Sequence, residues 1–245
     1  MIFSVSEGMN DAMRKRYPKL KHIPLKAIPY GVEVEDFNME LNSVRSGRLR
    51  IRHIGVVSED AQPVLHGLFG ALSQVSQSVD LTIEFYGTTY ARYDLAKPQL
   101  NPWKEEFNFD SRLLEHPRRV TYKRAVELTL TADILLLFGG MQSYYAASKL
   151  MGLVASQKPF LAFLHRDSFP SKFLASVNYP YLVLYSSENG DLPVDHVNEL
   201  TVQLKRLIHD RNVFQPIPFD HPAVQTHTAY GMTKSYVDEI NKVLN

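Results

Sequence analysis

The chain has 245 residues, of which 44% are hydrophobic and 22% charged, as in globular proteins with one large domain or two small ones. Its 27 basic and 26 acidic residues nearly balance, so no global field attracts nucleic acid or an anionic membrane. The chain has no cysteine, which excludes disulfides and cysteine catalysis and is typical of cytoplasmic proteins. The sequence shows no apolar stretch of membrane-spanning length and no signal-peptide pattern at its start.

The first 37 residues predict short elements that do not add up to a domain. A strand-like start leads to Ser6, a good N-cap for a helix, and residues 26–32 predict another short strand. We therefore expect residues 1–37 to be the tail of a preceding domain. Residues 38–48 are polar and rich in turn formers, which indicates a linker.

From residue 49 onward, strand patterns alternate with helical patterns, which predicts an α/β fold with a parallel sheet. Residues 90–110 are expected to be a loop or a short irregular helix. The expected strands are residues 49–57, 81–86, 119–122, 134–138, 160–164 and 181–185. The expected helices are residues 63–75, 125–131, a segment around 148–150, 171–176, 195–210 with Asp195 as its cap, and 229–244.

The segment from Ala132 to Phe163 is the most informative part of the chain. It contains an apolar strand, the pair Gly139 and Gly140, a helix and a second apolar strand, which together predict one βαβ unit. The first strand is apolar without alternation, as in a parallel strand that is buried on both faces. Because ligands bind at the carboxyl ends of such strands, we expect the chemistry between Gly139 and Lys149.

Four predicted strand ends converge on one edge of this sheet, at residues 55–58, 86–89, 121–124 and 139–143. Glycines there let a ligand approach the backbone, and Lys149 can reach back to neutralise a phosphate. A single glycine at a strand end more often serves only to form a turn. Because such glycines recur at one edge of the sheet, a ligand site and ordinary turns are about equally supported there.

Each candidate residue also has an ordinary interpretation. Lys149, Lys123 and Arg124 fit solvated helix charges, the pair Tyr144 and Tyr145 fits core packing, and residues 165–168 fit a plain loop. The histidines lack metal-ligand spacing, so we expect no metal site. The chain has neither a G-x-S-x-G elbow nor a Walker loop, which argues against a hydrolase of that type and a P-loop nucleotidase.

Several segments occur in an order that resembles the C-terminal half of glycosyltransferases of the GT-B fold, close to family 4. They are VSEGM near residue 5, IPYGVEVEDF at 28–37, LRIRHIGV at 49–56, FYG at 85–87, VTYKRAVELTLTADILLLF at 120–138 and SKLMGLVASQKPFLAF at 148–163. The resemblance implies a Rossmann-like domain at residues 49–228 that binds a nucleoside diphosphate sugar. It also implies a separate N-terminal acceptor domain, towards which a terminal helix at residues 229–245 crosses back.

The resemblance further implies which residues bind the donor. The loop at Gly55 to Ser58 would face the phosphates, the segment after residue 121 would frame the base, and Gly139 to Ser143 would lie along the sugar and diphosphate. The start of the helix at residue 148 would contact ribose or phosphate. The donor-binding set is Gly55, Val57, Gly87, Tyr122, Lys123, Arg124, Gly139, Gly140, Gln142, Ser143, Ser148 and Lys149.

The chain departs from the family pattern in two places. Many members carry an Arg and a Lys after the first glycine loop, but residues 57–66 have neither, and Glu59 and Asp60 would repel a phosphate. Tyr144 and Gly152 stand where many members have two glutamates. The catalytic residues are therefore left unassigned.

The resemblance implies a hexosyltransferase-like enzyme of polysaccharide biosynthesis that needs no cofactor or metal. It would transfer a sugar to a glycan or lipid-linked acceptor, in the cytoplasm or at the inner face of a membrane, and residues 1–245 alone would be inactive. One alternative is a degenerate, non-catalytic GT-B-like binding or assembly module. Another is an unrelated nucleotide-binding α/β domain, with residues 1–37 packed into its core.

Overall fold

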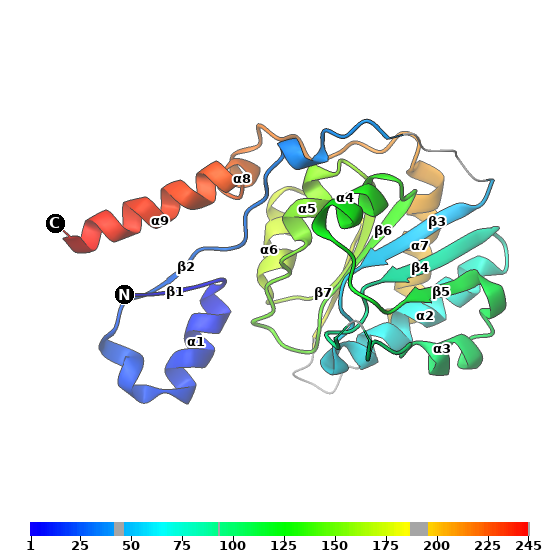
Figure 1. The fold of residues 1–245 in the computed structure, drawn as a ribbon, viewed down its shortest axis with the longest axis horizontal. Helices are drawn as coiled ribbons and strands as arrows, with labels where there is room; N and C mark the ends of the chain where they lie inside the picture. The colour runs from blue at the N-terminus through cyan, green and yellow to red at the C-terminus, as the bar shows by residue number, and fades with distance from the viewer. Residues whose placement is uncertain (42–46, 93, 187–195, 245) are drawn as a thin grey trace.

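The computed structural model describes residues 1–41, 47–92, 94–186 and 196–244 (Figure 1). Its larger part is a six-stranded parallel sheet in the order β5-β4-β3-β6-β7-β8. This is the order of a doubly wound Rossmann sheet, whose winding reverses between β3 and β6. The strands are β3 (Leu49–Ile54), β4 (Leu81–Tyr86), β5 (Leu113–His116), β6 (Ile134–Phe138), β7 (Phe160–His165) and β8 (Leu182–Tyr185).

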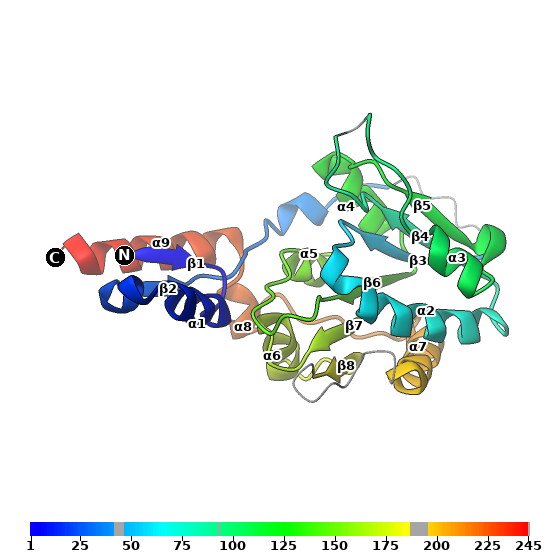
Figure 2. The same cartoon turned by 90° about the horizontal axis from the view of Figure 1, so that it is seen from below.

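Helices cover both faces of this sheet, as Figure 2 shows. One face carries α4 (Tyr122–Leu130), α5 (Leu150–Ala155) and α6 (Phe169–Ser176), and the other carries α2 (Gln62–Ser76), α3 (Asn101–Glu106) and α7 (Val197–Asp210). The double covering explains why every residue of β6 is buried and apolar. Short 3-10 turns complete the connections at η2 (Glu35–Phe37), η3 (Glu59–Ala61) and η4 (Asp110–Arg112).

A smaller part lies to one side of the sheet, where the two ends of the chain meet (Figures 1 and 2). There β1 (Ile2–Ser4) pairs in parallel with β2 (Leu25–Ala27), and in Figure 1 this pair lies between α1 (Glu7–Arg16) and α9 (Ala229–Leu244). The turn η1 (Pro18–His22) and the short α8 (Pro222–Gln225) flank these elements.

Several contacts join α9 to the N-terminal segment, among them a hydrogen bond of 2.8 Å from the amide of Ala229 to Val32 O. The rings of Phe3 and Tyr236 meet edge to face with centroids 4.9 Å apart, and Lys26 Nζ lies 3.2 Å from Glu239 Oε1. The amide of Gly31 donates to Met232 Sδ at 3.2 Å. Of the buried apolar residues in this segment, Val32 belongs to the core of the sheet, whereas Leu25 and Ile28 do not. This packing argues against core packing for residues 1–28 only, because Val32, Val34 and Phe37 do pack with the core of the sheet.

Most predicted elements agree with the structure. Helix α1 begins directly after Ser6, whose Oγ accepts a hydrogen bond from Met9 N at 3.1 Å. The strand predicted at residues 81–86 and the helix predicted at residues 229–244 have the observed bounds. The predicted cap Asp195 lies outside the described residues.

The strand predicted at residues 119–122 is wrong. The strand in this region is β5, which ends at His116, and Thr121 is instead the N-cap of α4. Its Oγ1 accepts from Arg124 N at 3.3 Å, which fixes the first turn of the helix. The helix therefore begins at Tyr122, three residues earlier than predicted.

None of the helices in the described ranges is both long and apolar enough to cross a membrane.

Candidate functional site

A cavity of about 730 Å³ opens at the carboxyl ends of β3 and β4, next to the point where the winding of the sheet reverses. Its walls come from the loop after β3, from α4 and the start of α5, and from residues 30–37 of the connecting segment. A cleft at this position is where ligands bind in doubly wound sheets, because strand ends and backbone amides face it. The fold thus places the cavity at the edge of the sheet that the sequence indicated.

Five of the predicted donor-binding residues line this cavity. Two are glycines with positive φ, Gly55 (144°) and Gly87 (70°), so both strands turn in a conformation that favours glycine. The other three are Tyr122, Ser148 and Lys149. These five come from four separate elements, which the fold brings together.

The other predicted residues lie outside the cavity wall. Val57 is buried in the core, whereas Lys123 and Arg124 are exposed, and Arg124 pairs with Glu127 at 3.0 Å. In the loop after β6 the glycines are buried and the next polar residues exposed, and none of them lines the cavity: they are Gly139, Gly140, Gln142 and Ser143.

The ammonium of Lys149 lies directly over Gly55. A Cβ atom added to Gly55 would be 1.6 Å from Lys149 Nζ, so only glycine leaves room for this side chain. Lys149 is partly buried, and within the described ranges its ammonium makes no hydrogen bond and no ion pair. Burial lowers the pKa of Lys149 to about 8. A cation without a counter-ion at a glycine-lined strand end is suited to binding an anion.

Beneath this loop lies His53, a buried residue of β3. Its Nδ1 is 3.1 Å from the carbonyl oxygen of Leu136, so Nδ1 carries the proton and donates. Burial first, and the nearby Lys149 ammonium second, hold the pKa of His53 well below its usual value. The imidazole is therefore neutral and leaves Lys149 as the positive charge at this point.

A buried ion pair supports the floor of the cavity. Arg52 Nε of β3 lies 2.5 Å from Glu84 Oε2 of β4. The same guanidinium donates hydrogen bonds to Leu128 O at 2.9 Å and to Thr131 Oγ1 at 2.7 Å. The hydroxyl of Tyr86 donates to the same carboxylate at 3.2 Å. This network fixes the orientation of Arg52 and Tyr86, which both line the cavity.

The cavity is rich in tyrosine, which the sequence did not reveal. Besides Tyr122, its lining includes Tyr30, Tyr86, Tyr90 and Tyr145. Tyrosine offers a flat face for stacking and a hydroxyl for hydrogen bonding, so this lining is suited to a ligand with rings and hydroxyl groups. Of these four, the sequence pointed only to Tyr145, as a packing residue, and placed Tyr86 at the end of a predicted strand.

The connecting segment, residues 30–37, closes one side of the cavity. Tyr122 donates its hydroxyl hydrogen to Asp36 Oδ2 at 2.7 Å, which ties the start of α4 to this segment. Phe37 fills the space next to Gly152, where an added Cβ would lie 3.5 Å from the ring. Glu33 also lines the cavity and is the one carboxylate among its described lining residues. The segment IPYGVEVEDF at 28–37 was expected to belong to the tail of a preceding domain, and its place in the cavity wall depends on contacts between residues far apart in the chain.

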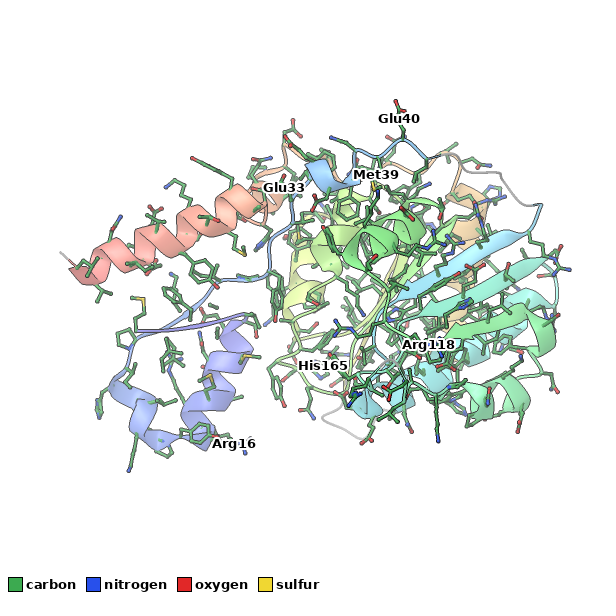
Figure 3. All side chains as sticks on the ribbon, in the orientation of Figure 1. Arg16, Glu33, Met39, Glu40, Arg118 and His165 are labelled. Atoms are coloured by element: carbon green, nitrogen blue, oxygen red, sulfur yellow. The ribbon has the colours of Figure 1, made fainter. Side chains whose placement is uncertain are left out.

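Two of the residues labelled in Figure 3 follow or end strands of the sheet. His165 lies at the carboxyl end of β7, and Arg118 lies in the loop that follows β5. The neighbouring Arg119 is exposed and lines the cavity. Within the part of the chain that the structure describes, no three His, Asp or Glu side chains are grouped so as to hold a metal ion.

Several solved structures share this fold. No protein-family model matches the chain, and no curated protein matches its sequence. A UDP-forming α,α-trehalose-phosphate synthase from Burkholderia xenovorans is similar, with a TM-score of 0.66 and 11% identity, over 100% of this chain and 61% of that one. A glycosyltransferase from Rickettsia africae ESF-5 has a TM-score of 0.63 and 13% identity, over 99% and 63%. The pneumococcal O-GlcNAc transferase GtfA, solved with UDP and GlcNAc, has a TM-score of 0.59 and 12% identity, over 99% of this chain and 45% of that one.

At such low identity these similarities show the fold. The predicted fold class is confirmed: the chain is a Rossmann-like α/β protein whose parallel sheet is flanked by helices, as in GT-B glycosyltransferases. The chain spans less than two thirds of the length of each of these structures.

Proposed function

We propose that this chain is the nucleotide-sugar-binding part of a glycosyltransferase, and that the cavity at β3 and β4 holds the donor. The observation that carries the proposal is the Lys149 ammonium, which lies over Gly55 without a counter-ion in the described ranges. A diphosphate would supply the missing negative charge, and the backbone at Gly55 to Ser58 would bind it closely. Ser148 and Gly87 belong to the same proposed site.

The rest of the lining fits the other parts of such a donor. The cavity volume of about 730 Å³ lies within the usual range for small-molecule sites. The wall with Tyr122 and Tyr30 offers faces on which a base can stack. Arg119 adds an exposed cation to those of Lys149 and Arg52, and Glu33 is an acceptor for ribose hydroxyls. The cavity thus combines cation, ring and acceptor, as a nucleoside diphosphate sugar requires.

In the intact enzyme, an N-terminal domain would bind the acceptor, as the chain's partial coverage of its structural neighbours favours. Residues 1–37 and α9 would belong to its side of the cleft, and residues 49–228 would form the donor domain. The reaction would be transfer of a sugar, hexose-like in size, to a glycan or lipid-linked acceptor. We place this in polysaccharide biosynthesis, in the cytoplasm or at the inner face of a membrane, and close to family 4. Without the acceptor domain, residues 1–245 would bind the donor but not turn it over.

The alternative of a non-catalytic module has its own support. Phe37 fills the space beside Gly152, and no cavity-lining residue among those described replaces the family glutamate from that helix. A protein of this kind would keep the fold and use its surface for assembly or glycan recognition. It predicts that nucleotides do not bind.

Calorimetry with UDP, GDP, ADP, CDP and dTDP separates the two functions. Donor binding predicts that at least one of these binds with a dissociation constant below about 1 mM, and that the nucleotide sugar of the same base also binds. Absence of binding for all five at millimolar concentration would contradict the proposal and favour the non-catalytic module.

The pH dependence of this binding gives a second test. In the free protein the pKa of Lys149 is about 8, and a bound diphosphate favours the charged form and raises that pKa. Binding then takes up a proton, so the affinity should fall as the pH rises above about 8, by up to roughly tenfold per pH unit. Calorimetry at pH 7, 8, 9 and 9.5, in buffers of different ionisation enthalpy, measures both effects. An unchanged affinity over this range would exclude a direct contact with Lys149.

A further inference from the structure

A second charged group lies at the same edge of the sheet, next to the cavity. Asp60 belongs to η3, and its carboxylate rests on Gly140, where an added Cβ would lie 2.1 Å from Asp60 Oδ2. Ser58, which lines the cavity, donates its hydroxyl hydrogen to Asp60 Oδ1 at 2.5 Å. The amide of Met141 donates to the carbonyl oxygen of Asp60 at 3.3 Å. Asp60 therefore joins the glycine loop after β3 to the glycine loop after β6.

The position of Asp60 has the properties of an anion site that the protein fills itself. It lies at the start of α2, a helix of 15 residues whose N-terminal end favours negative charge. Gly140 allows close approach to the backbone, and the Ser58 hydroxyl supplies a hydrogen bond. The Asp60 carboxylate occupies the space above Gly140 and accepts the hydrogen bond from Ser58, but it makes no capping hydrogen bond to α2. A phosphate placed there would meet a like charge and have no free donor from Ser58.

Lys149 places a positive charge at Gly55, at the other end of the loop that runs from β3 to Asp60. Its ammonium lies over Gly55, and within the described residues it has no ion pair. The cavity wall continues between the two poles through Ser58 and Tyr145, and Tyr145 lies close to both Gly139 and Asp60. Asp60 and Gly140 do not line the cavity themselves, so an extended ligand with its anionic end at Gly55 would reach the Asp60 carboxylate past Ser58 and Tyr145.

Resting on the proposed function, we infer that Asp60 determines specificity by setting the direction of the donor. It keeps the diphosphate at Gly55 and Lys149, and its carboxylate accepts hydrogen bonds from the hydroxyls of the transferred sugar at the Gly140 end. A carboxylate is a pure acceptor with two oxygens, which suits a sugar that offers neighbouring hydroxyl donors. Asp60 thus favours a nucleotide sugar over the corresponding nucleoside diphosphate.

The substitution Asp60→Asn tests this inference because it removes the charge and keeps the size. Calorimetry on the 245-residue chain would compare UDP with UDP-glucose, GDP with GDP-mannose and ADP with ADP-glucose. We expect the variant to bind the diphosphate about threefold more tightly and the nucleotide sugar about threefold more weakly, so that their ratio changes roughly tenfold. Glu59→Gln is the matched control, since Glu59 is an exposed neighbour in the same turn, and it should leave the ratio unchanged.

Asp60→Glu keeps the carboxylate and should retain the wild-type ratio within about twofold, and thermal melting of each variant would verify folding. If Asp60→Asn changes the affinity for both ligands equally, or if Glu59→Gln shifts the ratio as much, Asp60 acts through net charge alone and the inference is overturned. If the wild-type chain binds these ligands but Asp60→Asn leaves the ratio of their affinities unchanged, the role of Asp60 is refuted and the proposed function stands. If the wild-type chain binds none of the six ligands, the proposed function fails together with it.

Discussion

Lys149→Ala should weaken the binding of a nucleoside diphosphate by about thirtyfold or more, because a charge-assisted hydrogen bond contributes on the order of 2 kcal/mol. The ammonium lies over Gly55, and within the described part of the chain it has no partner that could take over its role. Calorimetry with the best ligand of the panel would measure the loss.

Two further variants make this result specific. Lys149→Arg keeps the charge and should recover part of the affinity, whereas Lys123→Ala removes an exposed lysine of α4 that does not line the cavity. We expect the Lys123 variant to bind within about twofold of the wild type, since exposed charges contribute little. An equal loss in both alanine variants would indicate a general charge effect instead of a phosphate contact at Lys149.

Glu84→Ala should lower the free energy of unfolding by about 3–5 kcal/mol, because it leaves the buried guanidinium of Arg52 without its carboxylate. The two side chains lie 2.5 Å apart in the middle of the sheet, and both are largely buried. Urea denaturation would measure the loss. Asp238→Ala is the control, since Asp238 pairs with Lys234 at 2.7 Å on the exposed surface of α9 and should cost less than about 1 kcal/mol.

The double variant Arg52→Met with Glu84→Leu gives a further comparison. Replacing both members of a buried ion pair by apolar residues of similar size is often nearly neutral, so the double variant should recover most of the lost stability. Because Tyr86 also hydrogen-bonds to Glu84, the double variant should still alter the cavity floor. A loss below about 1 kcal/mol in Glu84→Ala would show that Arg52 is solvated or paired elsewhere.

The strands of the sheet were predictable because the sheet is covered on both faces. The run Ile134–Phe138 has no polar alternation, and the structure buries all five residues. The start of α1 was predictable from its cap Ser6, whereas α4 and α6, capped by Thr121 and Ser168, begin earlier than predicted. The misplaced strand at residues 119–122 shows the limit: Thr121 is a helix cap, and β5 contains Glu115, which accepts hydrogen bonds from the amides of Gln99 and Leu100.

The candidate site was predictable only where it depends on the strand ends. Gly55, Gly87 and Lys149 follow from the pattern of strand, glycine and helix. The wall formed by residues 30–37 depends on tertiary contacts such as the hydrogen bond from Tyr122 to Asp36, between residues 86 positions apart. Likewise, Asp60 was expected from the sequence to repel phosphate, but its contact with Gly140 is visible only in the fold.

A crystal structure of the chain with the tightest-binding nucleoside diphosphate would test the central claim most directly. We expect diphosphate oxygens within hydrogen-bonding distance of Lys149 Nζ and of the backbone amides at Gly55 to Ser58, with the base on the side of Tyr122. A nucleotide bound elsewhere, for example in the smaller cavity between Lys26 and α9, would contradict the account.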